Sequence, residues 1–120
     1  MKKDEATSRL FEAARLGNVA NVQAALDAGG DVNSRETHTQ ATPLHWASAY
    51  GNQEAVKSLI ANGADVNAKD AHGGTPTHWA SASDHKKVVK LLADAIDQQQ
   101  SHTGRVTKGR KDQGPPQVGS

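Results

Sequence analysis

The sequence predicts an all-α fold, a solenoid of about three stacked helix-turn-helix repeats joined by hairpin-like loops. Two observations lead to this prediction. The hexapeptide TPLHWA, which begins at Thr42, returns as TPTHWA at Thr75, 33 residues later. Upstream, the stretch LFEAARLGNVANVQAALDAGGDVN from Leu10 matches the stretch that begins at Leu44, with an offset of 34. Self-similarity at a fixed period of about 20 to 50 residues is typical of stacked-repeat proteins. The offset of 34 is one residue longer than the offset of 33, and we place this extra residue in the connecting loop.

The composition fits one domain with a core of small aliphatic side chains. The chain has 120 residues, of which 35% are hydrophobic and only 3% aromatic. Its formal net charge of +1 indicates no particular polyanionic partner, and the absence of cysteine excludes disulfides and thiolate metal sites. The basic N-terminus is not followed by an apolar signal region, and no apolar run is long enough to span a membrane. We therefore expect a cytoplasmic protein.

The chain divides into a repeat domain, residues 1–100, with three repeats at about 4–36, 37–70 and 71–100. The first repeat has no TPLH sequence, because Arg9 and Phe11 stand where the second repeat has proline and histidine. Terminal repeats of solenoids are atypical, since one of their faces meets solvent. We therefore interpret the first copy as the N-terminal end of the stack.

The second repeat is the most regular, and its sequence predicts two short helices. Thr42 is a suitable N-cap because its hydroxyl can accept a hydrogen bond from the first turn, and Pro43 stands where its missing N–H costs nothing. The first helix is expected over residues 43–50 and the second over residues 53–62, where Gly63 ends it. Neither helix is long enough to be stable alone, so stacking must bury their apolar faces.

The third repeat starts with the same pair, Thr75 and Pro76, and then departs from the pattern. Thr77 replaces the leucine of the second repeat, Asp84-His85 replaces Gly-Asn, and three lysines follow on the second helix. A large apolar side chain contributes only where something packs on it. We interpret this copy as a polar C-terminal cap, and a decaying or truncated copy is the alternative interpretation.

These residues resemble the ankyrin repeat, with its 33-residue period and T-P-L-H-x-A signature. The likeness is dense over residues 42–70, good over residues 4–33 and partial over residues 75–100. The resemblance implies structural roles for the motif residues, which cap the first helices, lock each loop onto its helix, end the second helix and brace the following loop: Thr42, Pro43, His45, Gly63, Asp65, Asn67, Thr75, Pro76 and His78.

The sequence shows no pattern of catalytic or metal-binding residues. Serine, histidine and aspartate are scattered at positions fixed by the repeat, and they do not form a nucleophile with its base. His38 and His72 fall at neighbouring loop tips, but no carboxylate lies near them at ligand spacing. We therefore expect no enzymatic activity, no metal and no cofactor.

Ankyrin-like stacks bind partners, usually proteins, through the loop tips and the exposed side of the first helices. The resemblance therefore implies a protein-protein interaction module, acting as a monomer or a weak homo-oligomer. Tyr50 is the preferred contact because aromatic anchors dominate interface energies, with an ordinary solvated residue as the alternative, whereas Trp46 and Trp79 are expected to pack. The expected contact residues are Arg15, Leu16, Glu36, Thr37, His38, Thr39, Gln40, Ala49, Tyr50, Lys69, Asp70, Ala71, His72, Ala82 and Ser83.

Residues 101–120 form a separate tail, with four basic residues against one acidic residue, Asp112. Such a segment cannot bury enough apolar surface to offset its ordering entropy, so we expect it to be disordered. Its charge gives an alternative function, in which the repeats are a scaffold and the tail contacts nucleic acid or an anionic membrane surface. Without aromatic residues such contacts would be weak, and a solubilising tail is favoured. A third possibility is that the repeats belong to a larger assembly.

Overall fold

The computed structural model describes residues 3–101, which form six α-helices, and residues 1–2 and 102–120 lie outside this description. The first helices of the three repeats are α1 (Lys3–Leu16), α3 (Pro43–Ala49) and α5 (Pro76–Ala82). The second helices are α2 (Val19–Asp27), α4 (Gln53–Ala61) and α6 (Lys86–Ser101). Residues 3–101 contain no strand, and the predicted all-α repeat solenoid is confirmed. Apart from Ser101 at the end of α6, the predicted tail lies outside the described residues.

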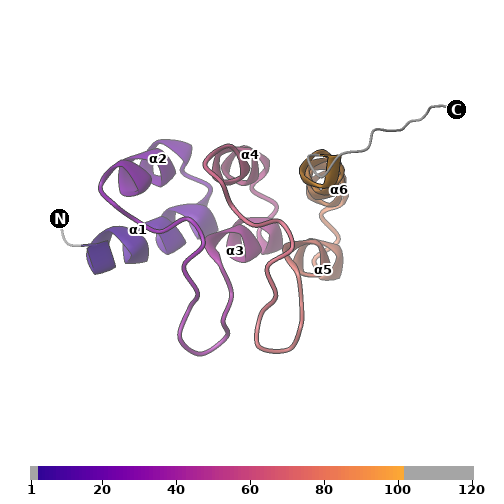
Figure 1. The fold of residues 1–120 in the computed structure, drawn as a ribbon, viewed down its shortest axis with the longest axis horizontal. Helices are drawn as coiled ribbons and strands as arrows, with labels where there is room; N and C mark the ends of the chain where they lie inside the picture. Colours follow the sequence, from indigo (N-terminus) through magenta and orange to yellow (C-terminus); the bar gives the residue numbers. More distant parts are fainter. Residues whose placement is uncertain (1–2, 102–120) are drawn as a thin grey trace, which may run out of the picture.

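The helices lie in two layers, and each contacts its neighbours in the stack. Figure 1 shows α1, α3 and α5 side by side in one layer and α2, α4 and α6 in the other, with two loops projecting from the layer of first helices. Helix α3 packs against α1, α4 and α5, whereas α4 packs against α2 and α6 in addition to α3. Each repeat therefore gains its stability from the adjacent repeats, as expected for a solenoid.

One row of aliphatic side chains runs through all three repeats as a core. Its largest members are fully buried leucines, namely Leu10, Leu44, Leu59 and Leu92. Alanine occupies many of the remaining buried positions, among them Ala14, Ala47 and Ala80. These small residues let neighbouring helices approach closely, which agrees with the low aromatic content of the sequence.

The helices of the second repeat begin and end close to the predicted positions. Helix α3 begins at Pro43, and Thr42 is its N-cap, with the hydroxyl accepting a hydrogen bond from the His45 N–H at 3.4 Å. Helices α3 and α4 each end one residue before the predicted position, because Tyr50 and Asn62 serve as C-caps. The capping pattern therefore fixes these boundaries locally.

The turn between the two helices of each repeat requires a residue with positive φ. Gly17 and Gly51 supply it in the first two repeats, with φ of +76° and +70°. The third repeat places Asp84 there, with φ of +62°. A residue with a Cβ atom adopts this conformation less readily than glycine, so the third repeat holds a less favourable turn than the other two.

Candidate functional site

The two projecting loops, which connect α2 to α3 and α4 to α5, close through backbone hydrogen bonds (Figure 1). In the first loop the Glu36 N–H donates to the Ala41 carbonyl at 2.8 Å, and in the second the Asp70 N–H donates to the Gly74 carbonyl at 2.8 Å. The first closure therefore spans one residue more than the second. This difference accounts for the offset of 34 between the first two repeats and of 33 between the next two.

The carboxylate of Glu36 organises the first loop from inside. Its Oε1 accepts hydrogen bonds from the N–H of His38 at 2.9 Å, and from the N–H and hydroxyl of Thr39 at 2.7 and 2.9 Å. The N–H of Thr39 is the main cause that lowers the pKa of Glu36 below its ordinary value. The side chain of Gln40 also turns inward and donates to the Thr37 carbonyl at 3.2 Å. Glu36, Thr39 and Gln40 thus shape the loop, although the sequence analysis expected them to contact a partner.

Asp70 plays the same role in the second loop and joins that loop to α5. Its Oδ1 accepts from the N–H groups of His72 and Gly74, both at 2.8 Å. Its Oδ2 accepts from the indole Nε1–H of Trp79 at 2.7 Å. The N–H of Gly74 is the main cause that lowers the pKa of Asp70. This carboxylate, like that of Glu36, is therefore held ionised and faces its own loop.

The two loop tips are bonded to each other. The Ala71 N–H donates to the Thr39 carbonyl at 2.9 Å, and the guanidinium Nη1 of Arg35 donates to the Lys69 carbonyl. Cross-links between adjacent loops reduce the number of conformations that each loop can adopt. The tips therefore form one continuous surface across the first two inter-repeat loops.

The bases of the loops are linked by an asparagine of the first repeat. In both loops an aspartate accepts from the N–H two residues ahead, Asp31 from Asn33 and Asp65 from Asn67, each at 2.9 Å. The side chain of Asn33 also crosses to the second repeat, where its Oδ1 accepts from the Asp65 N–H at 2.7 Å and its Nδ2 donates to the Gly63 carbonyl at 3.1 Å. Gly63 itself follows the end of α4 with φ of +94°.

His45 connects the second repeat to the loop that follows it. Its Nδ1 accepts from the Thr42 N–H at 3.0 Å, and its Nε2 lies 2.9 Å from the Gly74 carbonyl. Since a carbonyl only accepts, these contacts assign the proton of the neutral ring to Nε2. The side chain is 0% exposed, and this burial is the main cause that lowers its pKa. The hydrogen bond to the next loop was not foreseen from the sequence.

Four aromatic rings form a row across α3 and α5. Trp79 contacts His45 and Trp46 edge-on, with ring centroids 5.1 and 5.2 Å apart. Trp46 in turn contacts Tyr50, with centroids 6.4 Å apart. Both indoles are half-buried, whereas Tyr50 is 51% exposed. The row therefore ends in an exposed phenol that is supported from behind by an indole.

The other helical residues singled out by the sequence lie beside this row. Arg15 and Leu16 are exposed at the end of α1, and Ala82 and Ser83 are exposed at the end of α5, whereas Ala49 is half-buried. Leu16, Tyr50 and Ser83 occupy the same position in successive repeats. The first helices consequently present a leucine, a tyrosine and a serine in sequence along the stack.

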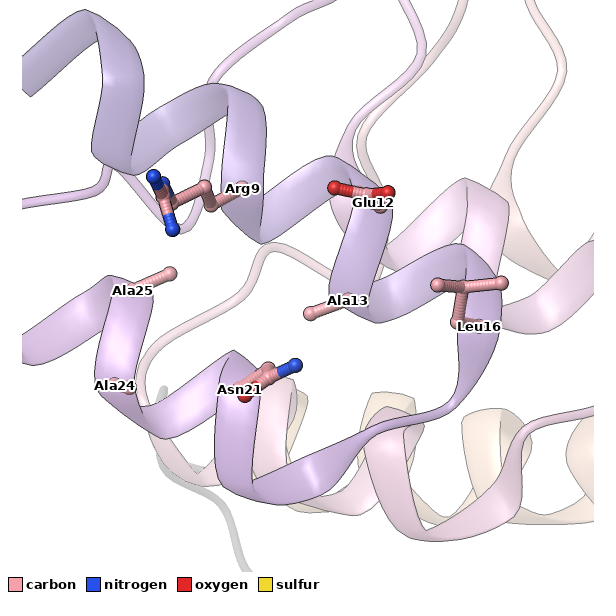
Figure 2. A pocket seen from close by; sticks show the side chains of 7 residues that line it. All are labelled: Arg9, Glu12, Ala13, Leu16, Asn21, Ala24 and Ala25. Carbon is pink, nitrogen blue, oxygen red and sulfur yellow. The ribbon is translucent and has the colours of Figure 1, made fainter.

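The structure also contains a groove that the sequence analysis missed, on the outer face of the first repeat. Figure 2 shows it between α1 and α2, with the other repeats behind it. It has a volume of about 240 Å³ and is lined by Arg9, Glu12, Ala13, Leu16, Asn21, Ala24 and Ala25. The aligned sequence held one signal for it. Glu12 and Ala25 stand where the second repeat has Trp46 and Leu59, so bulk is missing on this face.

Residues 3–101 contain no group of three or more histidine, cysteine, aspartate or glutamate residues that could hold a metal ion. Over the same range, no helix has both the length and the apolar character needed to cross a membrane.

Known proteins resemble this chain over its repeats. Residues 10–102 match the family described as ankyrin repeats in three copies. Ankyrin repeat domain-containing protein 40 of Mus musculus and of Homo sapiens is 37% identical over 60 residues, which is 50% of this chain and 16% of each relative. A transient receptor potential cation channel subfamily A member 1 homolog of Caenorhabditis elegans is 43% identical over 73 residues, 60% of this chain and 6% of that protein. The matched stretches thus span less than a fifth of these relatives.

Proposed function

This chain belongs to the ankyrin repeat family, and on that premise we propose that it is a protein-interaction module without catalytic activity. Repeats of this family generally serve to bind proteins. The proposed binding surface consists of the two loop tips and the exposed ends of the first helices. The contact residues named from the sequence remain part of this proposal.

The single observation that carries the proposal is the exposure of Tyr50 on a fixed support. This side chain is 51% exposed, yet its ring lies against Trp46. A tyrosine held in place before binding loses little conformational entropy when a partner covers it, and aromatic side chains dominate interface energies. Tyr50 is therefore the residue on which we expect binding to depend most.

The loop tips add a second, pre-ordered part of the surface. Because Glu36 and Asp70 are hydrogen-bonded inside their loops, the side chains that face outward are those of Thr37, His38 and Lys69, together with Ala71 and His72. The bond between Ala71 and Thr39 holds both tips in register. A partner therefore meets a surface that needs little further ordering, which favours affinity.

An affinity capture with three immobilised proteins tests this proposal. The wild-type chain, Tyr50→Ala and Lys57→Ala are each exposed to the same cell lysate, and captured proteins are quantified by mass spectrometry. Lys57 is exposed on α4, in the layer of second helices, and its ion pair with Glu54 at 3.2 Å is a surface pair of little value to stability. It is therefore a matched control for a surface substitution.

We expect a partner that wild type and Lys57→Ala retain and that Tyr50→Ala retains about tenfold more weakly or worse. Circular dichroism and urea unfolding of all three proteins verify that the fold is unchanged. If every captured protein binds the three equally, the assignment of the binding surface is wrong.

A further inference from the structure

The groove on the outer face of the first repeat has no part in the proposed partner surface except for Leu16 at its edge. We propose that it is where a second copy of this chain docks, so that two chains form a weak dimer with two-fold symmetry through α1 and α2. Three features of the groove support this occupant: its shape, its apolar floor and the charges on its rim.

The shape of the groove follows from the small side chains on the outer face of the first described repeat. In the second repeat the corresponding positions hold Trp46, Tyr50 and Leu59, of which Leu59 is 0% exposed within the stack. In the first repeat they hold Glu12, Leu16 and Ala25, and the smaller side chains leave the groove of about 240 Å³. This face therefore keeps the two-helix form of a surface that elsewhere packs on a neighbouring repeat, but it is hollowed.

The floor of the groove is apolar, and a large aliphatic side chain stands exposed at its edge. The buried Ala13 and Ala25 line the floor between the two helices, and the exposed Ala24 also lines the groove (Figure 2). Leu16 is 67% exposed, the highest value among the exposed large hydrophobic side chains of the described residues. Removing this surface from water favours association, and a partner with an apolar face of matching form achieves it.

The rim carries one cation and one anion that do not pair with each other. Arg9 and Glu12 are three residues apart on α1 and both are exposed. The surface ion pair between Lys57 and Glu54 on α4 involves neither of them. In a two-fold interface, residue i of one copy contacts residue j of the other, and residue j of the first contacts residue i of the second. A helix face with one charge of each sign can therefore pair each charge with the opposite charge of a second copy.

When two α1 helices pack antiparallel across the two-fold axis, Arg9 of each copy faces Glu12 of the other. Each copy then covers the groove of the other, and the exposed Leu16 at the edge is the large apolar side chain that can fill it. A dimer through one small face lies at the weak end of protein interfaces, so we expect dissociation at micromolar or higher concentrations.

Head-to-tail stacking of the first repeat on the third repeat of another copy is the competing arrangement. The far face of the third repeat is less apolar than the equivalent face of the second repeat, since Thr77 and Ala93 stand where the second repeat has Leu44 and Ile60. A head-to-tail contact also does not close on itself, so it would continue into longer assemblies. A two-fold contact stops at the dimer, so the mass of the assembly distinguishes the two arrangements.

Sedimentation velocity over a concentration series, with charge-swapped variants of the full chain, tests the dimer. The variants are Arg9→Glu, Glu12→Arg, their equimolar mixture, and Lys57→Glu as a charge reversal on α4. Each rim variant places like charges opposite each other at both pairs and is expected to be monomeric. In the mixture the introduced charges face each other and the native ones pair as before, so the dimer is expected to return. Wild type and Lys57→Glu should dimerise alike.

Several results would overturn the proposal. They are a wild-type chain that stays monomeric at the highest concentration reached, rim variants that dimerise like wild type, a mixture that stays monomeric, and assemblies that grow beyond the dimer. Urea unfolding of each variant separates loss of the dimer from loss of the fold. None of the variants alters Leu16 or Tyr50, so failure of this proposal leaves the proposed partner surface untouched.

Discussion

The second and third repeats open with almost the same six residues, yet the structure places those residues in different surroundings. In both repeats the histidine Nδ1 accepts from the threonine N–H, at 3.0 Å for His45 and 3.1 Å for His78. His45 is buried and its Nε2 also reaches the following loop. His78 is exposed, and within residues 3–101 its Nε2 has no hydrogen-bond partner. The motif therefore determines the local cap, and the next repeat determines burial.

The same difference extends to the positions on either side of the histidines. Leu44 is fully buried, whereas Thr77 is half-buried with a hydroxyl oxygen that is covered and has no partner. Ser48 is fully buried with an unpartnered hydroxyl, whereas Ser81 is exposed. A polar residue on a solvent-facing cap would expose its hydroxyl to water. The covered hydroxyl of Thr77 therefore departs in part from the polar cap that the sequence predicted.

Exchanging the residues at the leucine position gives the largest expected contrast. We expect Leu44→Thr to lower the free energy of unfolding by about 3 kcal/mol, because it removes buried apolar volume and buries a hydroxyl. Thr77→Leu should raise it by up to about 1 kcal/mol, since it removes a covered hydroxyl without an acceptor. Urea unfolding followed by tryptophan fluorescence measures both. A gain for Thr77→Leu as large as the loss for Leu44→Thr would show that the third repeat is covered as completely as the second.

Removing the two histidines tests the contribution of the inter-repeat hydrogen bond. His45→Ala loses the hydrogen bonds of the ring to Thr42 and to the Gly74 carbonyl, so we expect a loss of about 2 kcal/mol. His78→Ala loses only the hydrogen bond from the Thr75 N–H to the ring and should cost less than about 1 kcal/mol. The same urea titration measures both variants. A His78→Ala loss as large as that of His45→Ala would contradict the comparison.

The two serines provide a smaller contrast with the opposite sign. Ser48→Ala removes a buried hydroxyl that has no partner, so we expect the free energy of unfolding to rise by about 1 kcal/mol. Ser81→Ala alters an exposed side chain and should change it by less than about 0.5 kcal/mol. Thermal unfolding by circular dichroism is sensitive enough to rank the two. Destabilisation by Ser48→Ala would mean that its hydroxyl is satisfied in solution.

Mild acidification should destabilise the chain through His45. Its ordinary pKa is 6.5, and burial lowers the pKa in the folded state. Below 6.5 the unfolded chain therefore binds more protons than the folded chain, and the free energy of unfolding falls as the pH falls toward the folded pKa. Above 6.5 both states are neutral and the stabilisation is complete. Glu36 and Asp70, with ordinary pKa values of 4.5 and 3.8, act only at lower pH.

Urea unfolding from about pH 7.5 to about pH 5 measures this dependence, because histidine is the side chain that titrates there. In His45→Gln the free energy of unfolding should depend less on pH, because the buried ring is gone. His78→Gln retains His45 and should show the same pH dependence as wild type. An unchanged slope in His45→Gln would assign the dependence to another group.

Local signals explain the parts of the fold that the sequence predicted. The period gave the number of repeats, and Thr42, Pro43 and Gly63 act on the backbone within a few residues of themselves, so the helix boundaries were predictable to one residue. The half-buried packing of Trp46 and Trp79 was also predicted. The roles of Glu36 and Asp70 were not, because an acidic residue at a loop tip looks the same in sequence whether it faces solvent or its own loop.

What the sequence determined by itself is therefore the repeat, the caps and the helices, since each depends on residues close together in the chain. Only the tertiary structure decided which copies of the motif are buried, how His45 and Asn33 join one repeat to the next, and where the groove lies. Those features depend on contacts between residues about one repeat apart. Two nearly identical hexapeptides came to differ because one has a repeat packed on it and the other ends the stack of described repeats.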